Sequence, residues 1–573
     1  MAHSDPASTA RADLDLWRTH AAGNSFDTDL FFRRLLERHL GPKFAATESR
    51  LRQVAEAAGP ELDVLVAESN RDENLPTLRR FDASGRAVEE VVFHPSYHVV
   101  GQVFWSSGVL SQLEEPGQEL ATGAVAYLLD QHGEAGHACP VACTAGAIKL
   151  LQRVGTEEQG RRYLPELLES DYRHRLHAAQ FVTEIQGGSD VGLNSCVATP
   201  DPERAGWYRI SGEKWFCSVA DAGLFVVSAR LQNAPEGTRG LGLFLVPRLI
   251  NGKPNGFVLN RLKTKLGTRS MATGEIVFDG ASGEAIGPLD EGFKNLVGIV
   301  LDTSRAHNAV AACGIMRRAF VEAQTFAARR RAFKNPILEY PAVQEILARM
   351  KLRTLAGLTT TFRILAMSDQ IQAEPDNAVL ADARRIAVMI NKYRTAVSST
   401  ANARDGIEVL GGNGTIDDFS PLPRLYRDAM VVESWEGTHN TLCAQVVRDF
   451  LARSLHRPWL EQISTEIEAI QHPQLSGPAA VADDLLGATQ LKISRLVDQP
   501  DNAPAHMRSV VDQMCRLTDW ISMVTHAQWV LEEYGSGDIL DAIELYRLTE
   551  LEGADSFDHP EIIELRRRLA AGL

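Results

Sequence analysis

Tyr208-Arg-Ile-Ser-Gly-Glu-Lys-Trp-Phe-Cys-Ser218 contrasts with the sequence on either side of it, because it is rich in aromatic and β-compatible residues. Further apolar runs of strand length follow it. These runs are Leu224-Phe-Val-Val-Ser-Ala-Arg-Leu231, Leu241-Gly-Leu-Phe-Leu-Val246 and Glu275-Ile-Val-Phe-Asp279. We therefore expect a β domain over residues 181–286.

Helical patterns flank this β domain on both sides. Residues 11 to about 180 contain apolar, helix-forming stretches punctuated by Gly and Pro. Long helical patterns also cover 293–334, 341–371 and 378–409, and several such helices with short breaks favour a bundle. The domains that we expect are a helical domain over 1–180, the β domain over 181–286, a helical bundle over 287–451 and an added helical domain over 452–573.

Composition and charge are typical of a folded protein in an aqueous compartment. Hydrophobic residues make up 44% and charged residues 23% of the chain, and the net charge of -15 opposes nonspecific attraction to nucleic acid or anionic lipid. Met1 to Trp17 does not read as a signal peptide, and no apolar run reaches membrane-spanning length. The seven cysteines are scattered, which fits reduced thiols. We expect a cytoplasmic protein without a membrane partner.

The common phosphate-binding loops are missing from the sequence. It contains neither a Walker loop nor a strand–GxGxxG–helix unit, so a Rossmann dinucleotide fold is unsupported. Gly411-Gly-Asn-Gly414 follows a helix rather than a strand. Taken alone, this piece indicates only a helix C-cap and a turn.

Five motifs are nevertheless informative when their order along the chain is considered. They are Thr183-Glu-Ile-Gln-Gly-Gly-Ser-Asp-Val191, Gly212-Glu-Lys-Trp-Phe-Cys-Ser218, Arg330-x-x-Phe333, Gly411-Gly-Asn-Gly414 and Ser434-Trp-Glu-Gly-Thr-His-Asn440. The ordered set resembles the acyl-CoA dehydrogenase superfamily over about residues 90 to 450. Six further segments, together with the added helical domain, resemble its AidB-like alkylation-response branch. They are Phe93-His-Pro-Ser-Tyr-His98, Gly136-His-Ala-Cys-Pro140, Lys265-Leu-Gly-Thr-Arg-Ser270, Met316-Arg-Arg318, Asn335-Pro-Ile-Leu-Glu-Tyr-Pro341 and Leu422-Pro-Arg-Leu-Tyr-Arg427.

This resemblance implies an α+β fold that is mainly α. It would consist of an N-terminal helical domain, a middle β-barrel, a C-terminal four-helix domain and the added helical domain. The resemblance also implies FAD at the junction of the domains and between the subunits of a homotetramer, or dimer of dimers. The substrate would be an acyl-CoA or a related thioester, and an electron-transfer flavoprotein or oxygen would accept the electrons.

The resemblance assigns FAD contacts position by position. Hydroxyl and backbone groups of the first two motifs can hydrogen-bond the flavin, and the aromatic ring of Phe216 would cover it. The guanidinium of Arg330 suits a pyrophosphate, with Phe333 beside the adenine, across a subunit interface. The glycines let backbone approach the cofactor closely. The implied set is Gln180, Val182, Thr183, Ser189, Phe216, Cys217, Ser218, Arg330, Phe333, Gly411, Gly412, Gly414, Thr438 and Asn440.

Glu436 stands where the family holds its general base. There a carboxylate takes the α-proton of the acyl group while a hydride leaves the β-carbon for the flavin. An isolated Glu would more simply be a solvated or capping carboxylate, and the ordered motifs favour the catalytic interpretation. Ser304 and Arg305 match positions that contact the CoA portion. The alternative for these two is an ordinary polar pair on a helix surface.

Some residues depart from the usual dehydrogenase pattern. Ile185 stands where most members have Pro, and Val219 stands where Asn or Gly is common. His439 and Thr441 follow the Glu436 turn in place of smaller or more apolar residues. Pro341 occupies a position that usually holds Gln. These departures leave open whether turnover is fast or residual.

A zinc site is an alternative for the histidines and cysteines of the first domain. The residues in question are His94, His98, His132, His137, Cys139 and Cys143. However, Pro95 interrupts the helical geometry that an i,i+4 histidine pair needs, and no CxxC motif is present. We expect no metal.

Three functions are consistent with the sequence. The first is an FAD-dependent acyl-CoA dehydrogenase or an oxidase-like relative, the second a DNA-associated protective flavoprotein, and the third a flavin oxygenase of a specialised pathway. Residues 451–573 hold 10 Lys and Arg against 20 Asp and Glu, a net charge of -10. Binding to phosphates needs several cationic contacts, and the basic cluster of this domain is only Arg566-Arg567-Arg568. We therefore expect no useful binding to duplex DNA at physiological salt.

Overall fold

The computed structural model describes residues 5–21 and 23–572, and the chain divides into two compact units. Unit 1 comprises the described residues of Met1–Pro60, Pro116–Gly133 and Asn308–Leu573, and unit 2 comprises Glu61–Glu115 and Glu134–His307. The fold is mainly helical with one middle sheet, which confirms the expected α+β class. Among the described residues, no helix is both long and apolar enough to span a bilayer.

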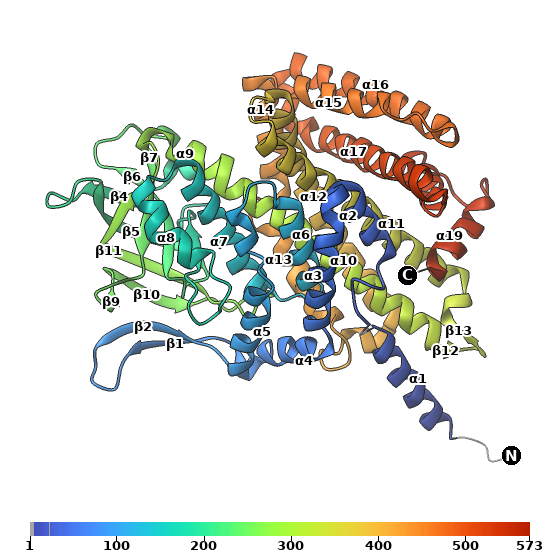
Figure 1. Ribbon diagram of the computed structural model, residues 1–573, viewed down its shortest axis with the longest axis horizontal. Helices are drawn as coiled ribbons and strands as arrows, with labels where there is room; N and C mark the ends of the chain where they lie inside the picture. The colour runs from blue at the N-terminus through green and yellow to red at the C-terminus, as the bar shows by residue number, and fades with distance from the viewer. Residues whose placement is uncertain (1–4, 22, 573) are drawn as a thin grey trace. The chain divides into compact units, whose positions relative to one another are not determined.

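A seven-stranded sheet forms the centre of unit 2 (Figure 1). Its order is β10-β11-β5-β4-β6-β3, and β7 pairs with both β11 and β6. Five of the strands therefore close into a ring, which is the expected middle barrel and which leaves few backbone groups on free edges. The strands are β3 (Ala178–Phe181), β4 (Val197–Pro200), β5 (Trp207–Ser218), β6 (Leu224–Leu231), β7 (Leu241–Pro247), β10 (Phe257–Leu262) and β11 (Thr273–Ala285).

Helices and a hairpin complete unit 2. The helices are α4 (Pro60–Ser69), α5 (Pro95–Ser106), α7 (Ala135–Val154), α8 (Glu157–Leu167), α9 (Gly292–Asn295) and the start of α10 (Leu301–Arg329), and two short strands, β8 (Leu249–Ile250) and β9 (Lys253–Pro254), form a separate pair. The sequence did not predict the hairpin of β1 (Thr77–Phe81) and β2 (Ala87–Val92). Its local signal is Asp82, whose carboxylate accepts hydrogen bonds from the backbone N–H groups of Ser84 and Arg86 in the turn.

Long helices build unit 1. The second and third helices of the expected bundle are α11 (Pro341–Ala373) and α12 (Ala378–Leu410), within two residues of the predicted ranges. Asn377 begins α12 by accepting a hydrogen bond from the backbone N–H of Leu380. The remaining bundle helices are the part of α10 from Asn308 onward, α13 (Leu422–Ser434) and α14 (His439–Arg453).

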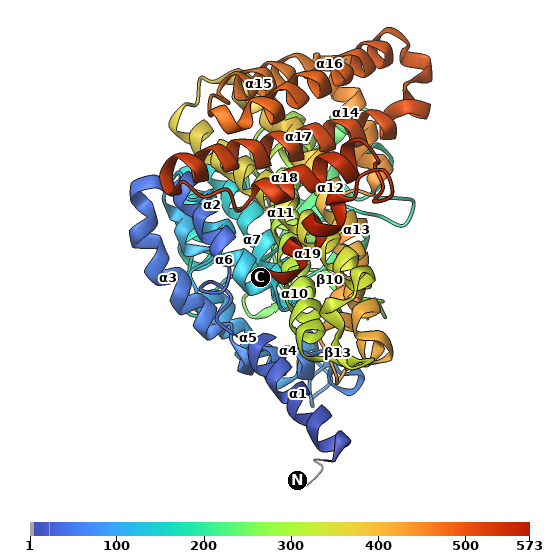
Figure 2. The same ribbon diagram turned by 90° about the vertical axis from the view of Figure 1, so that its right-hand side faces the viewer.

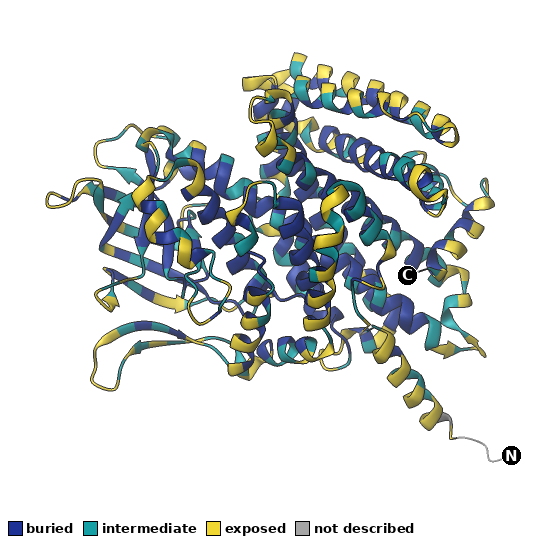
Figure 3. Ribbon diagram, in the orientation of Figure 1, coloured by how far each residue is buried: buried dark blue, intermediate teal, exposed yellow. Residues whose placement is uncertain are grey.

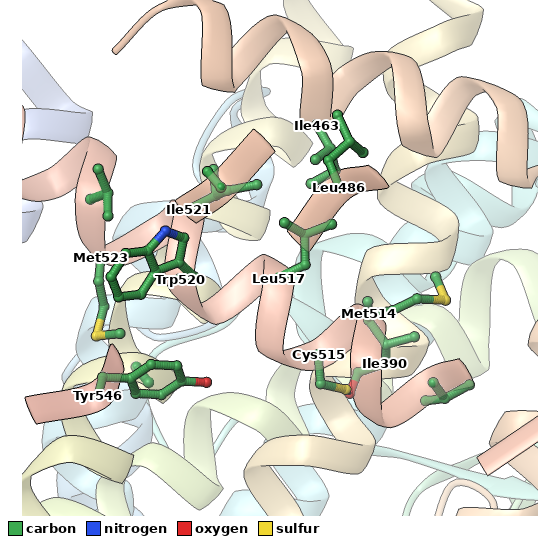
Figure 4. Packing of buried hydrophobic residues seen from close by; sticks show 14 of the residues in the cluster. Ile390, Ile463, Leu486, Met514, Cys515, Leu517, Trp520, Ile521, Met523 and Tyr546 are labelled. Carbon is green, nitrogen blue, oxygen red and sulfur yellow. The ribbon is translucent and has the colours of Figure 1, made fainter. Parts of the chain in front are cut away.

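The added helical domain packs against the bundle in the same unit. Its helices are α15 (His456–Glu468), α16 (Ser476–Asp498), α17 (Ala503–Tyr534), α18 (Leu540–Tyr546) and α19 (Glu561–Ala571), orange to red in Figures 1 and 2. Buried side chains of α17, such as Met514 and Trp520, share one hydrophobic cluster with Ile390 of α12 (Figure 4). Buried and exposed residues alternate along α15 and α16 (Figure 3), as an amphipathic pattern requires, whereas residues 517–524 of α17 are all buried. The core is therefore continuous from the bundle into the added helices.

The N-terminal helices of unit 1 are fastened by polar groups as well as by packing. They are α1 (Pro6–Ala21), α2 (Leu30–Leu40), α3 (Phe44–Ala57) and α6 (Glu119–Asp130). The indole of Trp17 donates to the backbone oxygen of Glu322 at 3.2 Å. Asp29 receives the Tyr127 hydroxyl at 2.9 Å and lies 3.2 Å from the guanidinium of Arg317, within the Met316-Arg-Arg318 segment.

His526 is a buried polar group in this helical core. It lies on α17 with 0% exposure, and neither ring nitrogen has a hydrogen-bond partner among the described residues. The rings of Phe31 and Trp529 lie 5.0 and 6.2 Å from its ring. Burial, aided by the charges of Arg38 and Arg34, lowers the pKa of His526 to about 3. The imidazole is therefore neutral in the folded protein.

This neutral histidine makes the fold sensitive to acid. The unfolded chain takes up a proton at this position below a pH of about 6.5, so stability is lost as the pH falls from there toward 3, by at most about 1.4 kcal/mol per pH unit. His526→Phe removes the titrating group and should reduce the drop in melting temperature between pH 7.5 and pH 5. The exposed His506 of α17 supplies the control, His506→Gln. Equal drops for the parent and His526→Phe would contradict this account.

Candidate active site

The residues that the sequence predicts for the site fall into two groups, one in each unit. Unit 2 contains the motifs of residues 183–191 and 212–218, together with Ser304 and Arg305. Unit 1 contains Arg330, Phe333, the glycine turn of residues 411–414 and the turn around Glu436. Each group has its own supporting contacts.

A buried ion pair joins the first two motifs of unit 2. Lys214 on β5 is 0% exposed and Glu184 is 2% exposed, and the Lys214 Nζ lies 2.7 Å from the Glu184 Oε1. The same carboxylate accepts the backbone N–H groups of Ser195 and Cys196 at 2.6 and 3.1 Å. Burial pushes the pKa of Glu184 upward, but Lys214 and the backbone donors outweigh it and leave the pKa lowered. The group is therefore a carboxylate.

This pair fixes the backbone on which Phe216 is presented. The backbone oxygen of Thr183 accepts the N–H of Trp215 at 2.9 Å, so the two motifs lie side by side. The pairing of β5 with β11 shifts register between Lys214 and Cys217, and at this irregularity Phe216 is 53% exposed while the side chain of Cys217 is buried. The Lys263 ammonium lies 3.5 Å from the centre of the Trp215 ring and 4.8 Å from that of Phe216. The outward face thus offers aromatic surface beside a cation.

Val219 is one of the residues that depart from the usual family pattern. It follows Ser218 with φ +58°, which is unusual for a β-branched residue and suits Asn or Gly. The residue is buried, and its backbone oxygen accepts the N–H of Ala222 at 2.9 Å. The turn keeps its left-handed conformation although the sequence places a strained residue there.

Ser304 and Arg305 are not a surface pair. Their exposures are 3% and 4%, which removes the alternative of an ordinary solvated pair. The side-chain amide of Gln180 donates to the Ser304 hydroxyl at 2.8 Å. A residue expected at the cofactor and one expected at the CoA chain are therefore in direct contact. The remaining predicted residues of this unit, Val182 and Ser189, are half-buried and exposed, respectively.

In unit 1, Glu436 lies in the short turn between α13 and α14. Its φ is +57° and that of Gly437 is +104°, so two successive residues adopt left-handed backbone. The Glu436 side chain is half-buried. Thr438, at the N-cap of α14, has its hydroxyl 3.0 Å from that of Thr441, and Asn440 is exposed. An unusual backbone conformation of this kind is common at functional positions.

Three further groups support this turn, and sequence reasoning did not identify their roles. Lys392 on α12 is 0% exposed and donates to the backbone oxygens of Glu433 and Gly437, each at 3.0 Å. The Glu433 carboxylate lies 2.8 Å from the Nε2 of His439. Burial pushes the pKa of Glu433 upward, but the bond to His439 and nearby charges outweigh it and lower the pKa. The signal for Lys392 in the sequence is weak, because it follows the apolar run Ile386-Ala-Val-Met-Ile390 but lies between Asn391 and Arg394.

The glycine turn combines open space with a close backbone contact. Gly411 has φ +63°, and a Cβ at Gly411 or Gly412 would meet nothing within 4 Å. A Cβ at Gly414 would lie 2.6 Å from the backbone oxygen of Ile407. Gly414 is thus required by α12 itself, whereas the first two glycines leave room for a ligand.

Arg330 and Phe333 lie at the small hairpin of β12 (Arg331–Ala332) and β13 (Asn335–Pro336). Arg330 is exposed, and Phe333 is 91% exposed at a φ of +50°. The hydroxyl of Tyr340 donates to the backbone oxygen of Ala332 at 2.7 Å and steadies the hairpin. An exposed phenylalanine and an exposed guanidinium at one hairpin suit a ligand that carries both an aromatic ring and a phosphate.

The residues present fit FAD in chemistry. Unit 2 offers the exposed aromatic face of Phe216 with the Thr183 and Ser218 hydroxyls, and unit 1 offers the open backbone at Gly411 and the exposed guanidinium of Arg330. Aromatic surface and hydroxyls match an isoalloxazine, and a guanidinium with open backbone matches a pyrophosphate.

The histidines considered for zinc have other partners. His94 caps α5 with its Nδ1 2.8 Å from the Ser96 hydroxyl, and the Nδ1 of His98 lies 3.1 Å from the Tyr172 hydroxyl. Pro95 begins the helix rather than interrupting it, so His94 precedes the first turn. Within the described parts of the chain, no group of three His, Cys, Asp or Glu side chains could hold a metal ion.

Three family models match the chain. They are the adaptive response protein AidB N-terminal domain over residues 18–174, the acyl-CoA dehydrogenase middle domain over 179–281 and the acyl-CoA dehydrogenase C-terminal domain over 290–451.

Two relatives match about two thirds of the chain. Putative acyl-CoA dehydrogenase AidB of Escherichia coli is 34% identical over 387 residues, which are 65% of this chain and 69% of that protein. Acyl-CoA dehydrogenase family member 11 of Caenorhabditis elegans is 33% identical over 391 residues, and the match spans 62% of that protein's length.

Solved structures agree in fold. Caenorhabditis elegans ACDH-11 in complex with C11-CoA superposes with a TM-score of 0.82 at 25% identity, covering 96% of this chain and 91% of that one. The acyl-CoA dehydrogenase of Bacillus anthracis complexed with FAD has a TM-score of 0.67 at 18% identity, covering 83% and 89%, and supports the fold alone.

The Lys214–Glu184 pair should behave as a buried ion pair. Lys214→Met leaves the Glu184 carboxylate buried without its cation and should cost about 3–5 kcal/mol. Adding Glu184→Gln removes the isolated charge, so the double variant should melt at a higher temperature than Lys214→Met alone. The exposed pair of Arg161 and Glu157 provides the control, and Arg161→Met should melt like the parent. A double variant that melts below Lys214→Met would contradict the ion-pair account.

Proposed function

Because the chain belongs to the acyl-CoA dehydrogenase family, in its AidB-like branch, and members of this family are FAD-type oxidoreductases, we propose that it dehydrogenates an acyl thioester. The observation that carries the proposal is the Glu436 turn. Glu436 has a left-handed backbone, and a buried lysine binds the backbone on either side of it. This geometry supports the role of general base that the family resemblance implies for Glu436.

The proposed reaction divides the two hydrogens between a base and the cofactor. FAD supplies a hydride acceptor when it is bound. Glu436 takes the α-proton of the acyl group, and the electron pair of that C–H bond becomes the new C=C bond as the β-hydrogen departs as hydride. Thr183 and Ser218 would hydrogen-bond the flavin, and the aromatic face of Phe216 would cover it. Arg330 would hold the pyrophosphate.

The substrate is proposed to be a CoA thioester because of the buried Ser304 and Arg305. Both are held in α10, and Ser304 contacts Gln180 on β3. A hydroxyl and a guanidinium in this place can bind the polar CoA chain while the carbonyl of the thioester acidifies the α-carbon. The relative with C11-CoA supports an acyl-CoA ligand for this fold.

Glu436→Gln tests the catalytic proposal. The amide keeps the shape of the side chain but removes its basicity, so the variant should retain FAD and lose at least roughly a hundredfold in the rate of flavin reduction by a reactive acyl-CoA. Anaerobic stopped-flow mixing measures this rate. Glu408, an exposed glutamate of α12, supplies the matched control Glu408→Gln, which should react like the parent. An unchanged rate in Glu436→Gln would remove Glu436 from this role.

A DNA-associated function is the alternative that the AidB-like branch suggests, and the charges of the added helices weigh against it. Arg566 pairs with Glu345 at 3.2 Å, Arg567 with Glu564 at 2.6 Å, and Arg568 with Asp541 at 2.6 Å. The basic cluster therefore already faces carboxylates, in a segment with a net charge of -10.

We therefore expect no useful binding to duplex DNA. Titrating a labelled duplex at about 0.15 M salt, where exposed charges are screened beyond about 8 Å, should give no saturable binding. The titration should be repeated at lower salt to reveal any phosphate contacts. Tight binding at the higher salt, with a steep salt dependence that is lost when residues 452–573 are deleted, would instead favour DNA protection.

A further inference from the structure

The turn that carries Glu436 rests on one buried side chain, Lys392. Its Nζ donates to the backbone oxygen of Glu433 on one side of the turn and to that of Gly437 on the other, both at 3.0 Å. Lys392 lies in the middle of α12 and is 0% exposed. A buried ammonium that binds two carbonyls across four residues ties the two ends of this turn to one rigid helix.

The backbone between these two ends is strained. Glu436 at φ +57° and Gly437 at φ +104° are both left-handed, and a residue with a Cβ adopts that region only at a cost. Such a conformation persists where the surrounding contacts enforce it. The two Lys392 hydrogen bonds act at the ends of the strained segment, where they oppose its relaxation.

A lysine suits this place for two physical reasons. The oxygen of Glu433 is among the last carbonyls of α13, which have no partner within their own helix, and a cation there is also favoured by the helix dipole. The ammonium carries three donors on one atom, so a single group can bind the helix end and the far side of the turn together.

A second contact spans the same segment. The Glu433 carboxylate lies 2.8 Å from the Nε2 of His439, the first residue of α14. His439 is one of the residues that depart from the usual family pattern. The side chains of Glu433 and His439 thus connect the end of α13 with the start of α14. Lys392 connects the backbone on the two sides of the same turn.

We propose that Lys392 is a positioning residue for the proton-abstraction step, with the Glu433–His439 contact as its support. By fixing both ends of the turn, Lys392 holds the Glu436 carboxylate in one place before substrate binds. This inference rests on the proposed function, because it assigns a catalytic purpose to the orientation of Glu436.

Kinetics on the FAD-loaded protein test whether Lys392 acts through Glu436. Lys392→Met should slow flavin reduction by a saturating acyl-CoA at least about tenfold, the effect of leaving buried acceptors without donors, with little change in the substrate concentration for half-maximal rate. Lys392→Arg, which keeps the charge and donors, should recover part of the rate. In the Glu436→Gln background, Lys392→Met should cause no further loss, because a positioning residue has nothing left to position.

The control is a half-buried lysine of the same unit. The Nζ of Lys351 on α11 donates to the backbone oxygen of Gly572 at 2.8 Å, so Lys351→Met also removes a donor from a backbone carbonyl. It should leave the rate of flavin reduction unchanged. A loss of equal size in Lys351→Met, or a Lys392→Met loss that persists in the Glu436→Gln background, would overturn the inference in favour of general destabilisation. An unchanged rate in Lys392→Met would overturn it directly.

Hydrogen exchange gives a readout that does not need turnover. Peptides covering residues 432–441 should exchange at least about tenfold faster in Lys392→Met than in the parent, and peptides covering 212–218 should not change. If Lys392→Met fails to fold, His439→Ala should show the same change in the same peptide to a smaller degree. Unchanged exchange of 432–441 in the folded variants would overturn the inference.

The two sets of outcomes separate this inference from the proposed function. A parent protein that no acyl-CoA reduces would defeat the proposed function, while exchange in residues 432–441 would still decide whether Lys392 holds the turn. A parent that is reduced, with Glu436→Gln inactive and Lys392→Met fully active, would defeat only the inference about Lys392.

Discussion

The ion pair between Lys214 and Glu184 is the contact on which the unit 2 part of the site depends. Both side chains are withdrawn from water, and the Glu184 carboxylate also accepts two backbone N–H groups. Taking two charges out of water is costly unless geometry and additional hydrogen bonds compensate for it, as they do here. Because Lys214 and Phe216 lie two residues apart on one strand, a displaced ion pair would also displace the aromatic face expected to meet the flavin.

Unit 1 also contains a buried lysine, Lys392, in its part of the proposed site. Lys392 donates to the backbone oxygens of Glu433 and Gly437, at the irregular turn between α13 and α14. In both units a buried ammonium fixes irregular backbone next to a residue that we propose to take part in the chemistry. Pre-organisation of this kind favours catalysis because the reacting groups need little rearrangement when substrate binds.

The sequence predicted much of the fold and less of the site's support. The boundaries of α11 and α12 followed from uninterrupted helical patterns, and the middle barrel followed from strand-length runs and the family resemblance. The β1–β2 hairpin was missed because two short strands within a helical region give a weak periodic signal. Motif order indicated Glu436, but Lys392 joins the turn only through tertiary packing, which periodicity cannot reveal. Val219 was noticed as a departure, and its left-handed backbone became clear only from the structure.

Anaerobic titration of the FAD-loaded protein with a panel of acyl-CoAs of increasing chain length tests the central claim most directly. The account predicts that at least one thioester bleaches the flavin absorbance, and that the corresponding free acid does not, because only the thioester carbonyl acidifies the α-carbon enough for a carboxylate base. A protein that carries FAD and keeps its full flavin absorbance with every thioester of the panel would contradict the claim that this chain is an acyl thioester dehydrogenase.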